Sequence, residues 1–139
     1  MEITGRNVML CKMSGELFAL SCKKGYDSED FINKVMQSEE GQLLYSPNCI
    51  DMWLGADYVM QGIENDIYIE KGKVINNDIM RWIGYLYKCW SLSYPNESAK
   101  EILKQAPFDT LVQCYLGYHV MSCEDAILNL KELYLENNL

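Results

Sequence analysis

The chain has 139 residues and a mass of 16.1 kDa, which is the size of one ordinary domain. Hydrophobic residues make up 49% of the sequence, enough to build a core, so global disorder is excluded. Twelve basic residues against twenty acidic ones give a net charge of −8. This charge argues against a general binder of nucleic acid or of anionic membranes.

The apolar runs at 8–11 and 17–20 are too short for a signal peptide or a membrane span. We therefore expect a cytoplasmic protein that makes no membrane contact. Six cysteines are present and no two of them form a CxxC pair, so we expect six reduced thiols instead of disulfides or a zinc site. They stand at positions 11, 22, 49, 89, 114 and 123.

The first half of the chain reads as a series of helices. Apolar residues at 3, 4, 3 spacing favour one helix over 6–24, although Ser14-Gly15 between two apolar runs is also typical of a hairpin turn. Asp27 or Ser28 can cap a second helix with a narrow apolar stripe, and a short further turn spans 38–44. A helix at about 49–63 is apolar on two sides, which is typical of a central helix.

Residues 67–75 contain the one convincing strand signal, which indicates a small hairpin or an exposed loop. The strongest helix follows at about 78–92. Short helices are expected from Pro95-Asn96 to Gln105 and from Pro107 onward, where the missing N–H of a proline is harmless in the first turn. Ser122 with Asp125 predicts the start of a last helix. The expected stripe of helix 78–92 is Ile79, Trp82, Ile83, Leu86 and Trp90.

These elements predict an all-α fold. We expect one domain over residues 1–139, a bundle of six or seven short helices with a small β-hairpin or a loop near 65–76.

The sequence shows no phosphate-binding loop, dinucleotide fingerprint, nucleophile elbow or HExxH motif. His119 is the single histidine, with Cys114 and Cys123 near it in sequence. A metal site would need more ligands, and a Cys–His nucleophile pair would need an orienting motif. We expect no catalytic residue, cofactor or metal, and we interpret His119 as a partly buried residue beside a helix end.

Aromatic residues concentrate in 82–94, interleaved with Arg81 and Lys88. Three structures would explain this pattern. The preferred one is a helix packed on two sides with tyrosine hydroxyls at its wet edge. A base-stacking platform is opposed by the net acidity. A protein interface is the third, because Trp, Tyr and Arg concentrate binding energy there.

Several runs carry a resemblance to a known family: 82–90 (WIGYLYKCW), 97–102, 104–106, 115–121, 126–127 and 129–131. Together they resemble a family of small proteins of gut Firmicutes encoded near genes for ADP-ribosyltransferase-like toxins and their antitoxins. The chain departs from that family at Cys89, where tyrosine is usual. The resemblance implies an antitoxin or an accessory part of a toxin–antitoxin cassette, and it implies no catalytic residue.

The leading hypothesis is a cytoplasmic protein-binding module, antitoxin-like, that occludes a protein partner such as a toxin and does not bind nucleic acid directly. The alternatives are an enzyme with a pocket near His119 and a phage-type acidic inhibitor of a nucleic-acid enzyme. The acidic face of the last helix is itself most simply a solvated outer surface. The predicted interaction surface comprises Arg81, Tyr85, Tyr87, Lys88, Trp90, Tyr94, Tyr118, His119, Glu132 and Glu136.

Overall fold

The computed structural model describes residues 5–49 and 51–138, and over this part of the chain the architecture is all-α, as predicted. Its α-helices number eight, one more than the upper end of the prediction, because the short turn after Ser38 forms a separate helix. The elements in chain order are α1 (Arg6–Lys23), α2 (Ser28–Gln37), α3 (Glu39–Leu44), a 3-10 helix η1 (Asp51–Leu54), α4 (Ala56–Asp66), α5 (Asn77–Ser93), α6 (Ala99–Gln105), α7 (Phe108–Tyr118) and α8 (Cys123–Asn137).

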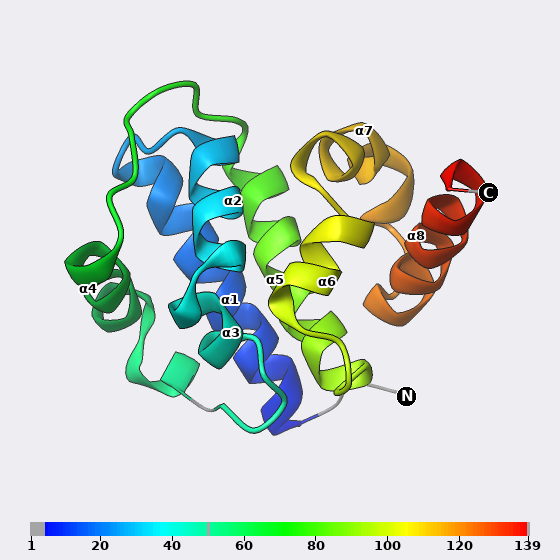
Figure 1. Cartoon of the computed structure of the whole chain (residues 1–139), viewed down its shortest axis with the longest axis horizontal. Helices are drawn as coiled ribbons and strands as arrows, with labels where there is room; N and C mark the ends of the chain where they lie inside the picture. Colours follow the sequence, from blue (N-terminus) through cyan, green and yellow to red (C-terminus); the bar gives the residue numbers. More distant parts are fainter. Residues whose placement is uncertain (1–4, 50, 139) are drawn as a thin grey trace.

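Helices α1 and α5 pack against each other at the centre of the molecule, with α4 on one side and α7 and α8 on the other (Figure 1). The Ser14-Gly15 pair lies inside α1, so the hairpin alternative for this segment is wrong. The small size of Ser14 and Gly15 lets α1 approach α5 closely, because a Cβ added to Gly15 would lie 2.9 Å from the Arg81 carbonyl oxygen. Small residues let two helix backbones approach closely, and that approach fixes α5 against α1.

Local capping places the helices as the sequence predicts at several points. The Asp27 side chain accepts a hydrogen bond from the Asp30 backbone N–H at 2.9 Å, which starts α2. The predicted stripe of α2 is fully buried. Ser122 Oγ accepts from the Asp125 backbone N–H at 3.1 Å, which starts α8. The α2 core residues are Phe31, Ile32, Val35 and Met36.

Other boundaries differ from the prediction. Gly55 has a φ of +97°, and this left-handed backbone divides the helix expected at 49–63 into η1 and α4. Ile50, also in that prediction, lies outside the described residues. Helix α6 begins after Ser98, which forms a capping box with Glu101, and not at Pro95-Asn96. Pro107 is the N-cap of α7 and stands just before its first turn.

Residues 67–75 form an extended, mostly exposed strap, so the loop alternative of the prediction is confirmed and the hairpin alternative is wrong. Their backbone bonds go to the start of α2: the Asp27 N–H donates to the Glu70 carbonyl at 2.8 Å, and the Ser28 N–H donates to the Lys73 carbonyl at 3.0 Å. The described part of the chain holds one isolated β-bridge, between Tyr26 and Lys71. The backbone N–H groups of Asp27 and Ser28 bind carbonyl oxygens of this segment. These carbonyls are therefore paired without a second strand. None of the described helices is both long and apolar enough to cross a bilayer.

Candidate functional site

The predicted interaction surface divides into two groups in the structure. Tyr87, Lys88 and Trp90 have no exposed side-chain surface, so their assignment to that surface is wrong. They are buried because α5 is covered by α1, α6 and α8 along this stretch. The remaining residues keep some or most of their surface open to solvent: Arg81, Tyr85, Tyr94, Tyr118, His119, Glu132 and Glu136.

The buried Lys88 holds the connection after α3 in place. Its Nζ donates to the carbonyl oxygens of Leu44 at 2.7 Å, of Ser46 at 3.2 Å and of Cys49 at 3.2 Å. Burial lowers the pKa of Lys88 below its ordinary value. Three carbonyl dipoles replace the water that the ammonium group loses, so this cation has a structural role.

Tyr87 and Trp90 are also anchored by hydrogen bonds. Tyr87 Oη donates to the Ala106 carbonyl at 2.7 Å, and Trp90 Nε1 donates to Glu97 Oε1 at 3.1 Å. Glu97 forms an ion pair with Lys131 of α8. The Lys131 ammonium lies 4.2 Å from the centre of the Tyr94 ring, so Tyr94 belongs to the same contact between α5 and α8.

A shallow groove of about 320 Å³ lies where α5 faces the turn between α7 and α8. One wall comes from α5 and the other from the turn and the first residue of α8. We call it the aromatic groove. It is lined by Asp78, Arg81, Trp82, Tyr85, His119, Met121 and Cys123. Arg81, Tyr85 and His119 of the predicted surface thus meet at one place.

Tyr115 of α7 connects these two walls. Its ring stacks on the His119 ring with centres 4.2 Å apart and planes 11° apart, and it meets the Trp82 ring edge-on at 5.6 Å. His119 Nδ1 lies 2.6 Å from the Tyr115 carbonyl oxygen. The His119 ring is therefore held in a fixed orientation at the rim of the groove. It stands at the end of α7, as expected, but it is exposed, so the expectation of partial burial is wrong.

The end of α7 leaves large apolar side chains in solvent. Leu111 is the one described residue of α7 that is buried. Leu116 is 81% exposed, and Val120, in the turn that follows, is 76% exposed. Leu116 is spaced from Leu111, Val112 and Tyr115 as the residues of one apolar helix face are, so the sequence pattern alone does not reveal its exposure. Exposed apolar residues clustered beside a groove are typical of an interaction site.

An acidic face borders the same end of α7. Glu132 and Glu136 of α8 are exposed. Burial raises the pKa of Tyr118, and the Cys114 thiol and the carboxylates of Glu132 and Glu136 raise it further. This electrostatic influence indicates that the acidic face of α8 lies close to Tyr118.

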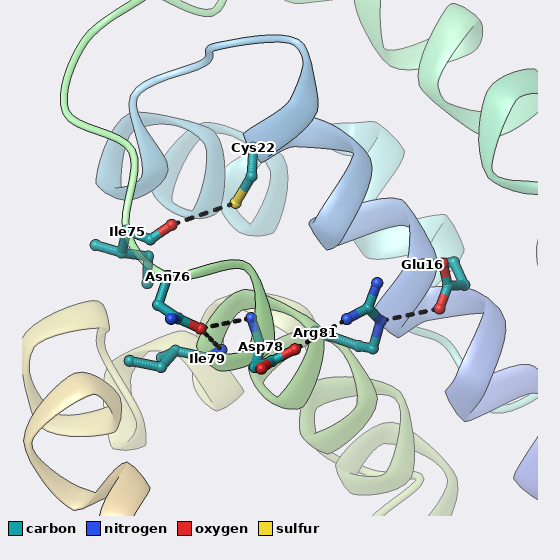
Figure 2. A network of polar contacts seen from close by, with 7 residues as sticks. All are labelled: Glu16, Cys22, Ile75, Asn76, Asp78, Ile79 and Arg81. Atoms are coloured by element: carbon teal, nitrogen blue, oxygen red, sulfur yellow. Dashed lines mark hydrogen bonds and ion pairs between the residues drawn. The ribbon is translucent and has the colours of Figure 1, made fainter.

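A larger hollow of about 590 Å³ lies on the other side of Arg81, between α1, the start of α4 and residues 74–77. Figure 2 shows the polar chain along it: Arg81 Nε donates to Glu16 Oε1 at 2.9 Å, and Arg81 Nη1 donates to Asp78 Oδ1 at 3.3 Å. Asn76 caps the start of α5 beside this chain by accepting from the Asp78 N–H at 2.7 Å. Arg81 is thus held by two carboxylates in the wall between the two cavities.

The cysteines differ from the prediction in one pair. Cys89 of α5 and Cys123 of α8 form a disulfide with Cα atoms 6.7 Å apart, so the expectation of six reduced thiols is wrong for these two. The other four are free thiols. A Glu124 carboxylate oxygen lies within 4.8 Å of both sulfurs, a set that offers three ligand atoms to a metal. Metals bind cysteine as a thiolate, and the two sulfurs carry no thiolate charge while they are joined to each other. The disulfide form therefore does not offer this ligand set.

Comparison of the chain with protein-family models, with curated proteins and with solved structures found no match. The features that bear on function are therefore the aromatic groove, the exposed end of α7 and the acidic face of α8 near Tyr118.

Proposed function

We propose that this protein is a protein-binding module that receives its partner in the aromatic groove and on the exposed end of α7. The observation that carries the proposal is the exposure of Leu116 and Val120, at 81% and 76%, beside a groove lined by Trp82 and Tyr85. Burial of apolar side chains drives protein association, and Trp, Tyr and Arg are the residues that concentrate its energy.

The size of the groove favours a side-chain anchor over a cofactor. Its volume of about 320 Å³ is at the small end of the range for sites that enclose a whole ligand, about 300–1,000 Å³. Its lining carries one carboxylate, of Asp78, and one guanidinium, of Arg81, and these two groups contact each other. An apolar side chain of a partner can fill the groove without leaving a buried charge unpaired.

The charge of the chain indicates the chemistry of the partner. The net charge is −8, and the carboxylates of Glu132 and Glu136 act on Tyr118 at the end of α7. The negative electrostatic field of this chain attracts a basic protein and repels an acidic one. We therefore commit to a partner that inserts an apolar anchor flanked by lysine or arginine.

An antitoxin-like role would give this surface a biological use. The resemblance of residues 82–90 and 115–121 to the Firmicutes family implies a toxin–antitoxin cassette, and a toxin that handles nucleic acid or a phosphorylated cofactor commonly has a basic active-site face. Occlusion of that face in the cytoplasm is the mechanism we propose. An acidic inhibitor of a nucleic-acid enzyme is the nearest alternative, because it would rely on the carboxylates of α8 and not on the groove.

The test uses purified protein and the purified product of each neighbouring gene, with the affinity measured by isothermal titration calorimetry. Leu116→Asp and Val120→Asp should each weaken the complex by about 30-fold or more, which is the effect of losing a hot-spot residue of about 2 kcal/mol. Leu43→Asp is the matched control, because Leu43 is 64% exposed on α3, away from the groove. Equal affinity in all three variants, or no complex with any neighbouring gene product, would overturn the proposal.

A further inference from the structure

The Cys89–Cys123 disulfide joins the two walls of the aromatic groove. Cys89 lies one helical turn after Tyr85 on α5, and Tyr85 lines the α5 wall. Cys123 lines the opposite wall and directly follows the turn that carries His119 and Met121. The separation of the walls is therefore set by a covalent bond at one end of the groove.

Other contacts hold α8 but leave the turn weakly held. Ala126, Ile127 and Leu130 are fully buried, and the Lys131–Glu97 ion pair fixes the helix two turns beyond Cys123. Within the turn, His119 stacks on Tyr115 of α7, and Met121 Sδ accepts a hydrogen bond from Asn129 Nδ2 at 3.2 Å. Tyr115 in turn meets Trp82 of α5 edge-on, so these contacts tie the turn to α5 through a ring pair and not through a bond of its own. Breaking the disulfide would therefore free the wall of the groove while α8 stays docked.

We propose that the Cys89–Cys123 bond is a redox-controlled latch on the aromatic groove, which holds the turn at 119–122 against α5 when oxidised and releases it when a dithiol reductant opens the bond. The latch rests on the docking function proposed above, since it regulates that same site. A disulfide in a cytoplasmic protein is usually transient and redox-sensing, which agrees with this use.

The two sulfurs differ in access, and this gives the reaction a direction. Cys123 is partly exposed, whereas Cys89 is buried. A thiolate of the reductant attacks Cys123 Sγ, a mixed disulfide forms there, and Cys89 leaves as a thiolate that takes up a proton. The second thiolate of the reductant then attacks the reductant's sulfur in the mixed disulfide, and Cys123 leaves as a thiolate that takes up a proton. The products are two protein thiols and one oxidised dithiol, so two electrons pass to the protein.

The structure also offers a hydrogen-bond acceptor to the Cys123 thiol of the reduced state. Glu124 Oε1 lies 2.8 Å from Cys123 Sγ, in position to accept a hydrogen bond from the thiol that reduction creates. The buried Cys11 stays out of the exchange, because burial raises its pKa to about 12 and leaves almost no thiolate at neutral pH. Cys11 therefore does not compete with Cys89 and Cys123 for the exchange.

Amide hydrogen exchange of the full chain tests the latch, measured before and after treatment with dithiothreitol. Reduction should raise exchange at 119–125 at least tenfold and leave α1 and α2 unchanged. Cys123→Ser should exchange fast at 119–125 in both conditions. Cys114→Ser is the matched control, because Cys114 is a partly exposed free thiol of α7, and it should respond like wild type.

Four results would overturn the latch. They are equal exchange in both redox states, a rise over the whole chain that makes the bond a general staple, six free thiols in untreated protein, and stoichiometric zinc in the isolated protein. The exchange experiment needs no partner, so the two proposals can fail separately. A redox response without any partner complex overturns the docking function alone, whereas a complex of equal affinity in both redox states overturns the latch.

Discussion

Ser14 and Gly84 form a close contact between the two central helices. Ser14 Oγ donates a hydrogen bond to the Gly84 carbonyl oxygen at 2.7 Å, and a Cβ added to Gly84 would lie 2.5 Å from the Ser14 carbonyl oxygen. No real Cβ tolerates such a distance, so only glycine fits here. This contact fixes the depth of α5 in the molecule, and the groove wall formed by Trp82 and Tyr85 depends on it.

Replacement of Gly84 should therefore destabilise the fold. The added methyl group of Gly84→Ala would also meet Phe18 Cγ at 2.8 Å, and overpacking of a core costs about 1–3 kcal/mol. The free energy of unfolding from urea denaturation measures this change. The better helix propensity of alanine, about 1 kcal/mol, offsets only part of the cost.

Gly62→Ala is the matched control for that measurement. Gly62 lies inside α4, and a Cβ added there meets nothing within 4 Å. The same substitution should stabilise the protein here by about 0.5–1 kcal/mol, because only the helix propensity changes. Equal effects at both positions would show that the α1–α5 contact is looser than the structure has it.

The two tryptophans of α5 should respond differently to truncation. Trp90 is fully buried and its Nε1 is bonded to Glu97, so Trp90→Ala should cost about 3–5 kcal/mol. Trp82 is partly buried and meets Tyr115 edge-on at the groove, so Trp82→Ala should cost about 1–3 kcal/mol. Thermal and urea denaturation measure both. A larger loss at Trp82 than at Trp90 would contradict the burial seen here.

Local signals in the sequence predict the helices well because each depends on neighbouring residues. Asp27, Ser98 and Ser122 cap helices through hydrogen bonds that span three residues. Burial around α5 was harder to predict, because this helix is covered on several sides and its polar residues are buried too. Lys88 looked like a surface cation, and only the fold brings the carbonyls of Leu44, Ser46 and Cys49 around it.

Long-range pairings account for the other differences. Cys89 and Cys123 are 34 residues apart, and no spacing pattern marks them as partners. The strap at 67–75 resembles a hairpin in sequence because two short apolar runs flank Lys71-Gly72, yet its hydrogen bonds go to the start of α2, some forty residues earlier. The exposure of Leu116 could not be predicted either. Its helical spacing is typical of a buried residue, but no element of the described chain covers that face of α7.

The contact between Glu97 and Lys131 should make stability depend on acid pH. Burial raises the pKa of Glu97, but hydrogen bonds from Lys131, Gln105 and Trp90 outweigh it and leave the pKa below its ordinary value of 4.5. The unfolded carboxyl therefore takes up its proton first as pH falls. The stability from this group is present above pH 4.5 and is lost as pH falls through the lower, folded pKa.

Urea denaturation of wild type and Glu97→Gln at several pH values measures that loss. The wild type should be more stable by about 1.5–3 kcal/mol at pH 7, the range for hydrogen bonds to a charged group. The difference should shrink steadily below pH 4.5. Glu70→Gln, at an exposed residue of the strap, is the control and should show little difference at any pH. A pH-independent gap for Glu97→Gln would mean that its charge contributes nothing.

Charge reversal on α8 should separate steering from docking. The double variant Glu132→Lys/Glu136→Lys changes the net charge by +4, from −8 to −4, on the face of α8 whose carboxylates act on Tyr118. Attraction of a basic partner mainly sets the association rate, so surface plasmon resonance at low salt should show association slowed about tenfold or more with little change in dissociation. At high salt the difference should fade, because screening shortens the reach of exposed charges to a few ångströms.

Leu116→Asp should behave in the opposite way, with faster dissociation at every salt concentration, because it removes a contact and leaves the long-range field nearly unchanged. If charge reversal abolishes binding at all salt concentrations while Leu116→Asp has no effect, the carboxylates of α8 are the docking surface, and the acidic-inhibitor alternative replaces the groove.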